Sequence, residues 1–287
     1  MKAPVVDYVR PSSVEEALRC LSEIDNARVL AGGQSLMAML NMRFAFPDCL
    51  VDINRIAELA HIRDTGTAIE IGAMTRQRDV EFSEVVAARL PILREAIVNV
   101  GHRQTRNRGT VGGSLCQLDP SAEIPTIATA MDAVISVGSV RGRREIAMAD
   151  FPAGYMSPSL EADEMLLGVT FTPWAAGHGH AFLEFSRRHG DFAIASAAVL
   201  LERGADGLLN RVSITLGGVA SAPIRMRQAE AALTATRAAP ADLDRAAALC
   251  GQVDASTDSY VPGWYRQRLA RVLSRRALAA ALERAEP

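Results

Sequence analysis

Apolar and polar positions in the first sixty residues alternate between the spacing of helices and that of buried strands. Apolar residues three and four positions apart over Val14–Ser22 predict a helix. The short apolar runs 28–33 and 47–56 end in turn residues and predict two strands, with a second helix over 35–44 between them. This alternation favours a small βαβ unit with a parallel or mixed sheet.

The next hundred residues combine a long helical region with strands of alternating polarity. Helical periodicity covers 75–101 and is broken near Pro91, and the polar segment 102–110 is predicted to be a loop. Asp119 as cap and Pro120 as first helical residue predict a helix that follows. Four further runs are typical of a mostly antiparallel sheet: 67–74, 133–139, 143–151 and 164–173.

The last third of the chain predicts a hairpin followed by a helical, alanine- and arginine-rich region. Pro173–Gly179 is the expected linker, and the strands 193–204 and 208–221 are joined by a turn over 204–207. The segment 265–285 is predicted to be an amphipathic helix with a solvated basic face. Its apolar positions lie largely on one face: Leu269, Val272, Leu273, Leu278 and Leu282.

Composition excludes several classes of protein. Apolar residues make up 49% and charged residues 22%, which is ordinary for a globular protein of this length and not for a disordered one. The net charge of -2 gives no basic field for nucleic acid. No window has the roughly 18 apolar residues of a spanning helix, and no signal peptide is visible, so we expect no transmembrane segment and a cytoplasmic location.

Four cysteines lie far apart, with no C-x-x-C among them. This spacing argues against a zinc or iron–sulfur site within the chain, and we expect reduced, mostly buried thiols. His178 and His180 are expected to lie in a solvated loop and not to bind metal. Arg103, Arg106 and Arg108 could help neutralise a diphosphate, but the interpretation we favour is a solvated polar loop.

Two glycine pairs, eighty positions apart, each precede a hydroxyl residue and an apolar segment. Glycines at such turns expose consecutive backbone amides, which bind anions, although a single pair of this kind is more often a purely structural turn. Neither fits G-x-G-x-x-G or the P-loop pattern. Two pairs could hold the two phosphoryl groups of one diphosphate. The motifs are Ala31-Gly32-Gly33-Gln34-Ser35 and Thr110-Val111-Gly112-Gly113-Ser114.

Five motifs in register carry a resemblance to a known family. They are AGGQSLMAMLNMRF, RNRGTVGGSL, DPSAEIP, EFSRRHGDFAIASAAV and YRQRLARVLSRRAL. Together they resemble the FAD-binding medium subunit of molybdenum hydroxylases, and the resemblance covers nearly the whole chain. The family includes the flavin subunits of aerobic carbon monoxide dehydrogenase and of bacterial nicotine and caffeine dehydrogenases, and the flavin domain of xanthine dehydrogenase.

The resemblance implies an α+β chain with a two-subdomain PCMH-type FAD-binding fold. A small βαβ-containing subdomain is expected over 1–58 and a second subdomain, a mostly antiparallel sheet with helices, over 59–176. A smaller α+β carboxy-terminal domain is expected over 177–287. FAD would lie, without a covalent bond, in the cleft between the two subdomains.

The resemblance also implies which residues bind FAD. Backbone amides of both motifs would wrap the pyrophosphate: Ala31, Gly32, Gly33, Gln34, Ser35, Leu36, Thr110, Val111, Gly112, Gly113 and Ser114. Glu123 matches a carboxylate near the ribose or adenine, and Asp119 is a second acidic candidate. Both acids have a structural alternative as residues of a helix start.

A further segment resembles the part of the family that approaches the isoalloxazine. It contributes Arg187, Arg188, Asp191 and Phe192 as candidates, since arginines stabilise charge on reduced flavin and an aromatic ring can stack on it. The alternative is an ion pair between Asp191 and an arginine. A lysine in the xanthine dehydrogenase pattern is replaced here by Leu183 or Glu184, so its role does not transfer.

The function implied is electron transfer within a complex, with no catalytic acid or base in this chain. A large partner subunit would carry the molybdenum cofactor and a small one the [2Fe-2S] clusters, in a dimer of heterotrimers that serves an external acceptor. Association of that complex with the inner face of the membrane stays open, as does the substrate. The alternatives are a stand-alone FAD-dependent reductase or oxidase of the same fold and a flavin-free scaffold subunit.

Overall fold

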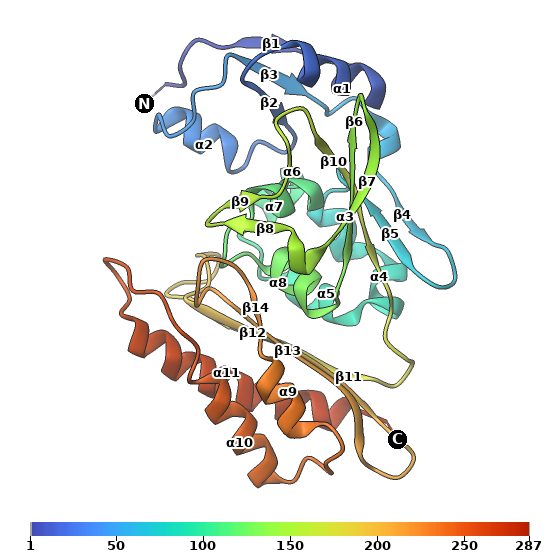
Figure 1. The fold of residues 1–287 in the computed structure, drawn as a ribbon, viewed down its shortest axis with the longest axis vertical. Coiled ribbons are helices and arrows are strands. Elements are labelled where there is room, and N and C mark those ends of the chain that lie inside the picture. Colours follow the sequence, from blue (N-terminus) through green and yellow to red (C-terminus); the bar gives the residue numbers. More distant parts are fainter. Residues whose placement is uncertain (1, 287) are drawn as a thin grey trace.

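Three main sheets follow one another along the long axis of the molecule (Figure 1). The computed structural model describes residues 2–286. A three-stranded sheet lies at the amino-terminal end, a five-stranded sheet in the middle and a four-stranded sheet at the carboxy-terminal end. The architecture is α+β, as the family resemblance implies.

The amino-terminal subdomain is built on a parallel sheet of order β1-β3-β2. Its central strand is buried at all four positions, and α1 covers it through Val14, Ala17, Leu18 and Leu21. The parallel pairing confirms the predicted βαβ unit. Its elements are β1 (Asp7–Val9), α1 (Val14–Glu23), β2 (Ala27–Leu30), α2 (Leu36–Asn41) and β3 (Cys49–Asp52).

The middle subdomain contains an antiparallel sheet of order β4-β5-β10-β6-β7, which confirms the predicted pairing. Its helices pack on this sheet around the largest apolar core of the described residues. The strands are β4 (Ile62–Asp64), β5 (Ile69–Gly72), β6 (Val134–Ser139), β7 (Gly142–Ala147), β8 (Pro152–Gly154), β9 (Ser157–Pro158) and β10 (Met165–Phe171). The helices are α3 (Gln77–Phe82), α4 (Glu84–Arg89), α5 (Pro91–Ile97), α6 (Arg103–Arg108), α7 (Val111–Gln117) and α8 (Glu123–Ala130).

The predicted helical region 75–101 is broken twice, not once. Besides the break at Pro91, which begins α5, the chain turns at Ser83. The Ser83 hydroxyl accepts a hydrogen bond from the amide of Val86, 3.2 Å away, and so caps α4.

The predicted loop 102–110 is wrong, because residues 103–108 form helix α6. Arg106 is 9% exposed, and its guanidinium pairs with Glu81 at 2.8 Å. It also donates to the backbone carbonyls of Val98 and Val100. Arg106 is therefore neither solvated nor directed to a diphosphate. Arg103 and Arg108 are exposed, as expected.

The carboxy-terminal domain has an antiparallel sheet with helices on one face and the middle subdomain on the other. The hairpin of β12 and β13 is confirmed, but β11 was not predicted. Val272 is 37% exposed, so its predicted place on the buried face of the last helix is wrong. The elements are β11 (Gly179–Phe185), β12 (Ala195–Arg203), β13 (Leu209–Gly217), β14 (Ile224–Arg225), α9 (Arg227–Leu233), α10 (Pro240–Cys250) and α11 (Gly263–Arg284).

Neither a spanning helix nor a disulfide occurs in the part of the chain that the structure describes. Within residues 2–286 no helix has both the length and the apolar character needed to cross a bilayer. All four cysteines lie in this range and are free thiols; Cys49 and Cys250 are buried, and Cys20 and Cys116 are partly buried.

Candidate functional site

The two glycine motifs, far apart in the sequence, touch each other in the fold. A Cβ atom built on Gly32 would lie 3.0 Å from the Cα of Gly109 and 2.9 Å from the carbonyl carbon of Arg108. One built on Gly113 would lie 3.9 Å from the Cβ of Ala31. Only glycine at position 32 permits this approach, so the first loop seats directly on the residues that precede the second motif.

Backbone amides of the first loop are free to bind a ligand. Among the described residues, none accepts a hydrogen bond from the amides of residues 32–36. Gly33 has φ +73°, in the left-handed region that favours glycine, and turns the chain into α2. Five consecutive unpaired donors form a concave surface suited to an anion.

The amides of the second motif, in contrast, are used within the protein. Val111 and Gly112 donate to the carbonyls of Thr75 and Ala73, at 3.0 and 2.9 Å. Gly113 donates to the hydroxyl of Thr110 at 3.0 Å, which caps α7. The second motif therefore supplies a rigid wall, and the expected wrapping by amides of both motifs is supported only for the first.

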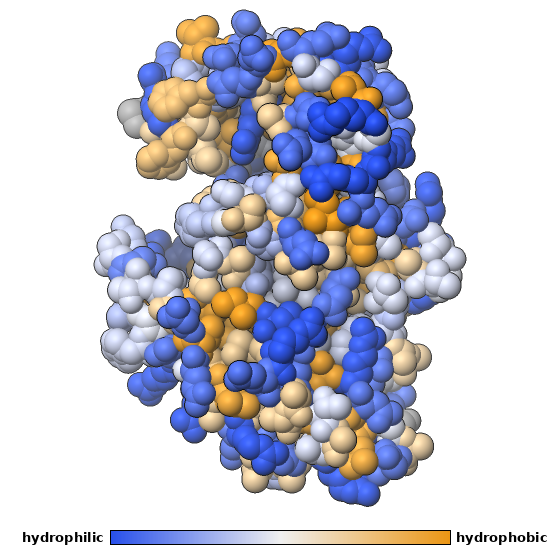
Figure 2. All heavy atoms as spheres, in the orientation of Figure 1, coloured by the Kyte–Doolittle hydropathy of each residue, from blue (hydrophilic) through white to orange (hydrophobic). Residues whose placement is uncertain are grey.

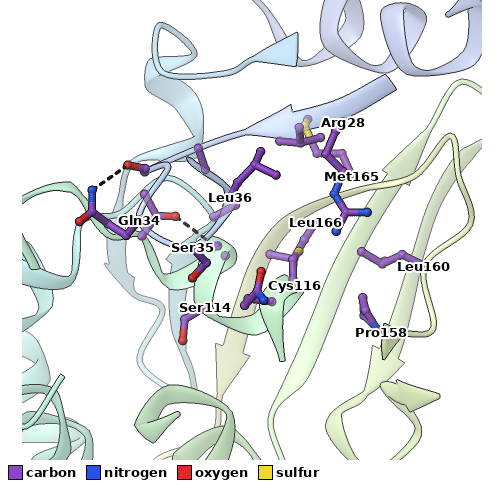
Figure 3. A pocket seen from close by; sticks show the side chains of 18 of the residues that line it. Arg28, Gln34, Ser35, Leu36, Ser114, Cys116, Pro158, Leu160, Met165 and Leu166 are labelled. Carbon is purple, nitrogen blue, oxygen red and sulfur yellow. Dashed lines mark hydrogen bonds between the residues drawn. The ribbon is translucent and has the colours of Figure 1, made fainter. Parts of the chain in front are cut away.

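Both motifs line a cleft of about 590 Å³, within the range of about 300–1,000 Å³ that is usual for ligand pockets. Figure 3 shows Ser35 and Leu36 from the first loop and Ser114 and Cys116 from α7 around the same space. Met165 and Leu166 of β10 border it on the other side. Figure 2 shows the surface hollowed between the amino-terminal subdomain and the parts below it.

Family models match almost the entire chain. Residues 4–174 match the FAD binding domain in molybdopterin dehydrogenase, and residues 180–281 match the CO dehydrogenase flavoprotein C-terminal domain. The chain belongs to the FAD-binding subunits of molybdenum hydroxylases. The resemblance stated from the five motifs is thereby confirmed.

Relatives of this FAD-binding subunit extend over its full length. It is 40% identical to the 6-hydroxypseudooxynicotine dehydrogenase complex subunit alpha of Paenarthrobacter nicotinovorans, with 100% of this chain and 98% of the relative covered. It is 36% identical to the carbon monoxide dehydrogenase medium chain of Afipia carboxidovorans, with 98% of each covered.

Solved structures of related enzymes support the same family assignment. A chain of carbon monoxide dehydrogenase from Hydrogenophaga pseudoflava matches with a TM-score of 0.96 at 35% identity, and 100% of both chains is covered. A chain of quinoline 2-oxidoreductase from Pseudomonas putida 86 matches with a TM-score of 0.94 at 31% identity, and 99% of both chains is covered. The predicted α+β fold with its FAD-binding and carboxy-terminal parts is confirmed.

Glu123 and Asp119 both line the cleft of this FAD-binding subunit. Glu123 is 5% exposed, and burial, reinforced by the charge of Glu184, raises its pKa to about 8. Burial also raises the pKa of Asp119. A carboxyl group beside the cleft fits the hydroxyls of a ribose or ribityl chain.

The predicted start of the helix at Asp119 and Pro120 is wrong. Helix α8 begins at Glu123 with Ala122 as its cap residue. The carboxylate of Asp119 instead accepts a hydrogen bond from the amide of Ser121, 2.9 Å away, which holds a turn between α7 and α8. This turn is what brings both acids to the cleft.

Phe192 lines the cleft and is 63% exposed, so its ring stands at the rim. The other three candidates of that segment are absent from the described residues that line the cleft. Arg188 forms an ion pair with Asp191 at 3.3 Å, which confirms the alternative interpretation, and the guanidinium of Arg187 lies 5.3 Å from the ring of Tyr260.

The surroundings of Val111 and His180 show where these two candidate residues lie relative to the cleft and the solvent. Val111 is 2% exposed and packs in the core of the middle subdomain, away from the cleft. His180 does not lie in a solvated loop, since it belongs to β11 and its side chain is 20% exposed. Within residues 2–286 no three His, Cys, Asp or Glu side chains are placed to hold a metal ion.

Sequence reasoning missed the far wall of the cleft. It is formed by the segment from β9 to β10, including Pro158, Leu160, Met165 and Leu166. These residues are apolar like any core residue, and only the fold places them opposite the glycine loops. No local pattern distinguishes them.

Proposed function

We propose that this FAD-binding subunit holds FAD non-covalently in the 590 Å³ cleft, with the pyrophosphate against the free amides of the first glycine loop. The observation that carries the proposal is the convergence of both glycine motifs on one cleft. The carboxyl group of Glu123 forms hydrogen bonds with sugar hydroxyls, and Phe192 contacts the ring system at the rim. Bound FAD supplies the redox chemistry, and the chain needs no acid or base of its own.

We further propose the electron path. Substrate oxidation at a molybdenum cofactor on a large partner subunit releases electrons, which pass to the [2Fe-2S] clusters of a small partner subunit. From these clusters the electrons enter the flavin of this chain and then leave to an external acceptor. The relatives' names as a complex subunit and a medium chain support a multi-subunit assembly. A dimer of heterotrimers, a cytoplasmic location, and the division of the chain at residues 58 and 176 are part of the same proposal.

Reconstitution tests the two parts separately. The apoprotein, titrated with FAD and passed through gel filtration, should retain flavin in a one-to-one ratio. Isolated holoprotein should take electrons from a chemical reductant, yet oxidise no organic substrate until the large and small subunits are added. Turnover by the chain alone would favour a stand-alone reductase or oxidase, and failure to retain flavin would favour a scaffold.

A further inference from the structure

Glu184 lies near the end of β11, on the face of the carboxy-terminal sheet that packs against the middle subdomain. It is directly opposite Ser196 of β12, and Ser196 is opposite Gly217 of β13. Residues opposite each other in antiparallel strands share a face of the sheet, and so do residues two positions apart. Glu184, Ser196, Gly217 and Thr215 therefore form one polar surface.

Three oxygen atoms on this surface have no hydrogen-bond partner among the described residues. They are Oε2 of Glu184, Oγ of Ser196 and Oγ1 of Thr215. Ser196 is 1% exposed and Thr215 is fully buried. Buried hydroxyls are nearly always satisfied by protein or by an ordered water, so the unpaired oxygens indicate a bound polar species.

Helix α8 faces this surface from the middle subdomain. A Cβ built on Gly217 would lie 2.5 Å from both the Ser196 hydroxyl and the Thr126 hydroxyl, so the missing side chain is what lets α8 come this close. Glu123, one turn before Thr126, begins the helix and lines the cofactor cleft. The polar surface thus continues through Glu123 to the cleft.

Positive charge near the two carboxyl groups is scarce. Burial raises the pKa of Glu123 most, and the charges of Glu184 and Asp119 raise it further; a backbone hydrogen bond lowers it, and Arg106, itself paired with Glu81, is the one cation that does so among the described residues. Burial alone raises the pKa of Glu184, to about 7, and β12 presents a hydroxyl to it, not a cation. Two ionised carboxylates without a cation are strongly disfavoured in such a place.

We propose that Glu123, which lines the cofactor cleft, and Glu184, on the carboxy-terminal sheet behind it, form a proton-holding site, with ordered water joining them to the Ser196 and Thr215 hydroxyls. The inference rests on the proposed binding of FAD in this cleft. The site binds ordered water, and its two carboxyl groups hold one exchangeable proton. That proton allows an acidic side chain to stand beside an anionic cofactor.

The site links cofactor affinity to pH. The protonated pair is neutral or carries one charge, whereas full ionisation places two negative charges beside the cleft that holds the anionic cofactor. An anion in the cleft therefore favours protonation, and FAD affinity is highest below the pKa values of the pair and falls as pH rises through them. For each proton that the carboxyl pair releases, the affinity for FAD falls by at most tenfold per pH unit.

The experiment compares FAD binding to full-length apoprotein from about pH 6 to about pH 9, the interval around the two raised pKa values. Wild type should bind progressively more weakly toward the upper end. The E123Q/E184Q double variant should show a flat dependence, because glutamine keeps the shape and cannot ionise. E184Q should titrate at lower pH than wild type, since Glu123 loses its like-charged neighbour. E145Q removes an exposed carboxyl group and serves as the matched control, with wild-type behaviour expected.

Infrared spectra of the apoprotein give a readout independent of flavin. At neutral pH the wild type should show a carboxylic acid carbonyl band that shifts in D₂O and is absent from the double variant. Identical bands and identical pH dependence in the two proteins would overturn the proton site while FAD still binds. Absence of FAD binding at every pH, with the band present, would instead contradict the proposed function and leave the proton site standing.

Discussion

Replacing Gly32 by alanine tests how the two glycine loops create the cofactor site. The added Cβ would lie 2.9 Å from the carbonyl carbon of Arg108, 3.0 Å from the Cα of Gly109, and closer still to the Arg108 carbonyl oxygen. Ordinary contact between such atoms is about 3.5 Å or more, so the loops must separate by roughly 1 Å. All the atoms in conflict belong to backbone and cannot turn aside.

A displacement of that size exceeds the tolerance of a hydrogen bond, whose donor–acceptor distances span only about 0.5 Å. If two amides of the first loop lose their bonds to phosphate, at about 1.5–3 kcal/mol each, the loss is about 3–6 kcal/mol. The FAD dissociation constant should then rise by roughly 10²- to 10⁴-fold. The overpacking itself should lower the free energy of unfolding by about 1–3 kcal/mol.

The assay is fluorescence titration of apoprotein with FAD, paired with urea unfolding. Gly154→Ala is the matched control, because its Cβ would meet only the Cβ of Ser157 at 3.8 Å and should leave both quantities unchanged. A folded G32A protein that binds FAD within threefold of wild type would refute the assignment of this loop to the pyrophosphate.

Three other predictions concern the scaffold around the cleft. Arg106→Met should destabilise the fold by about 3–5 kcal/mol, because it leaves the Glu81 carboxylate, whose side chain is only 13% exposed, without its partner; urea unfolding of R106M and of the E81Q/R106M double variant checks this, and no recovery in the latter would count against it. Thr110→Ala should cost about 1 kcal/mol through loss of the α7 cap, whereas T110S should retain it; equal unfolding midpoints for the two would contradict the capping role. Glu164 accepts two hydrogen bonds from Arg144, which lower its pKa, so its contribution to stability is present above the unfolded pKa and is lost as pH falls through the folded one; unfolding curves should show E164Q less stable than wild type at neutral pH and equal to it once Glu164 is protonated in both the folded and the unfolded state.

Local sequence signals predicted the amino-terminal unit well because its helix and strands are determined by residues close together in the sequence. The helix over Val14–Ser22 and the strand inside 47–56 follow from apolar spacing and burial, and both occur. The glycine loops were found for the same reason, since a turn that needs glycine is visible in the sequence.

Predictions from the sequence were wrong where contacts with residues distant in the sequence determine the structure. Helix α6 exists in a polar, arginine-rich segment because Arg106 meets Glu81 and two carbonyls, which no local pattern reveals. The state of the second motif's amides depends on Ala73 and Thr75, nearly forty residues earlier. Strand β11 was hidden because its polar positions, Glu184 among them, face another subdomain and not solvent.

The seating of the first glycine loop on the second subdomain has a thermodynamic consequence. A cofactor held by residues from both sides of that junction acts as a cross-link, so its binding free energy is also a free energy of association between the two bodies. At a free concentration one hundred times the dissociation constant this adds about 2.7 kcal/mol. Flavin supply would then determine how often residues 1–58 open away from the rest of the chain, and protease sensitivity at the junction would report cofactor saturation.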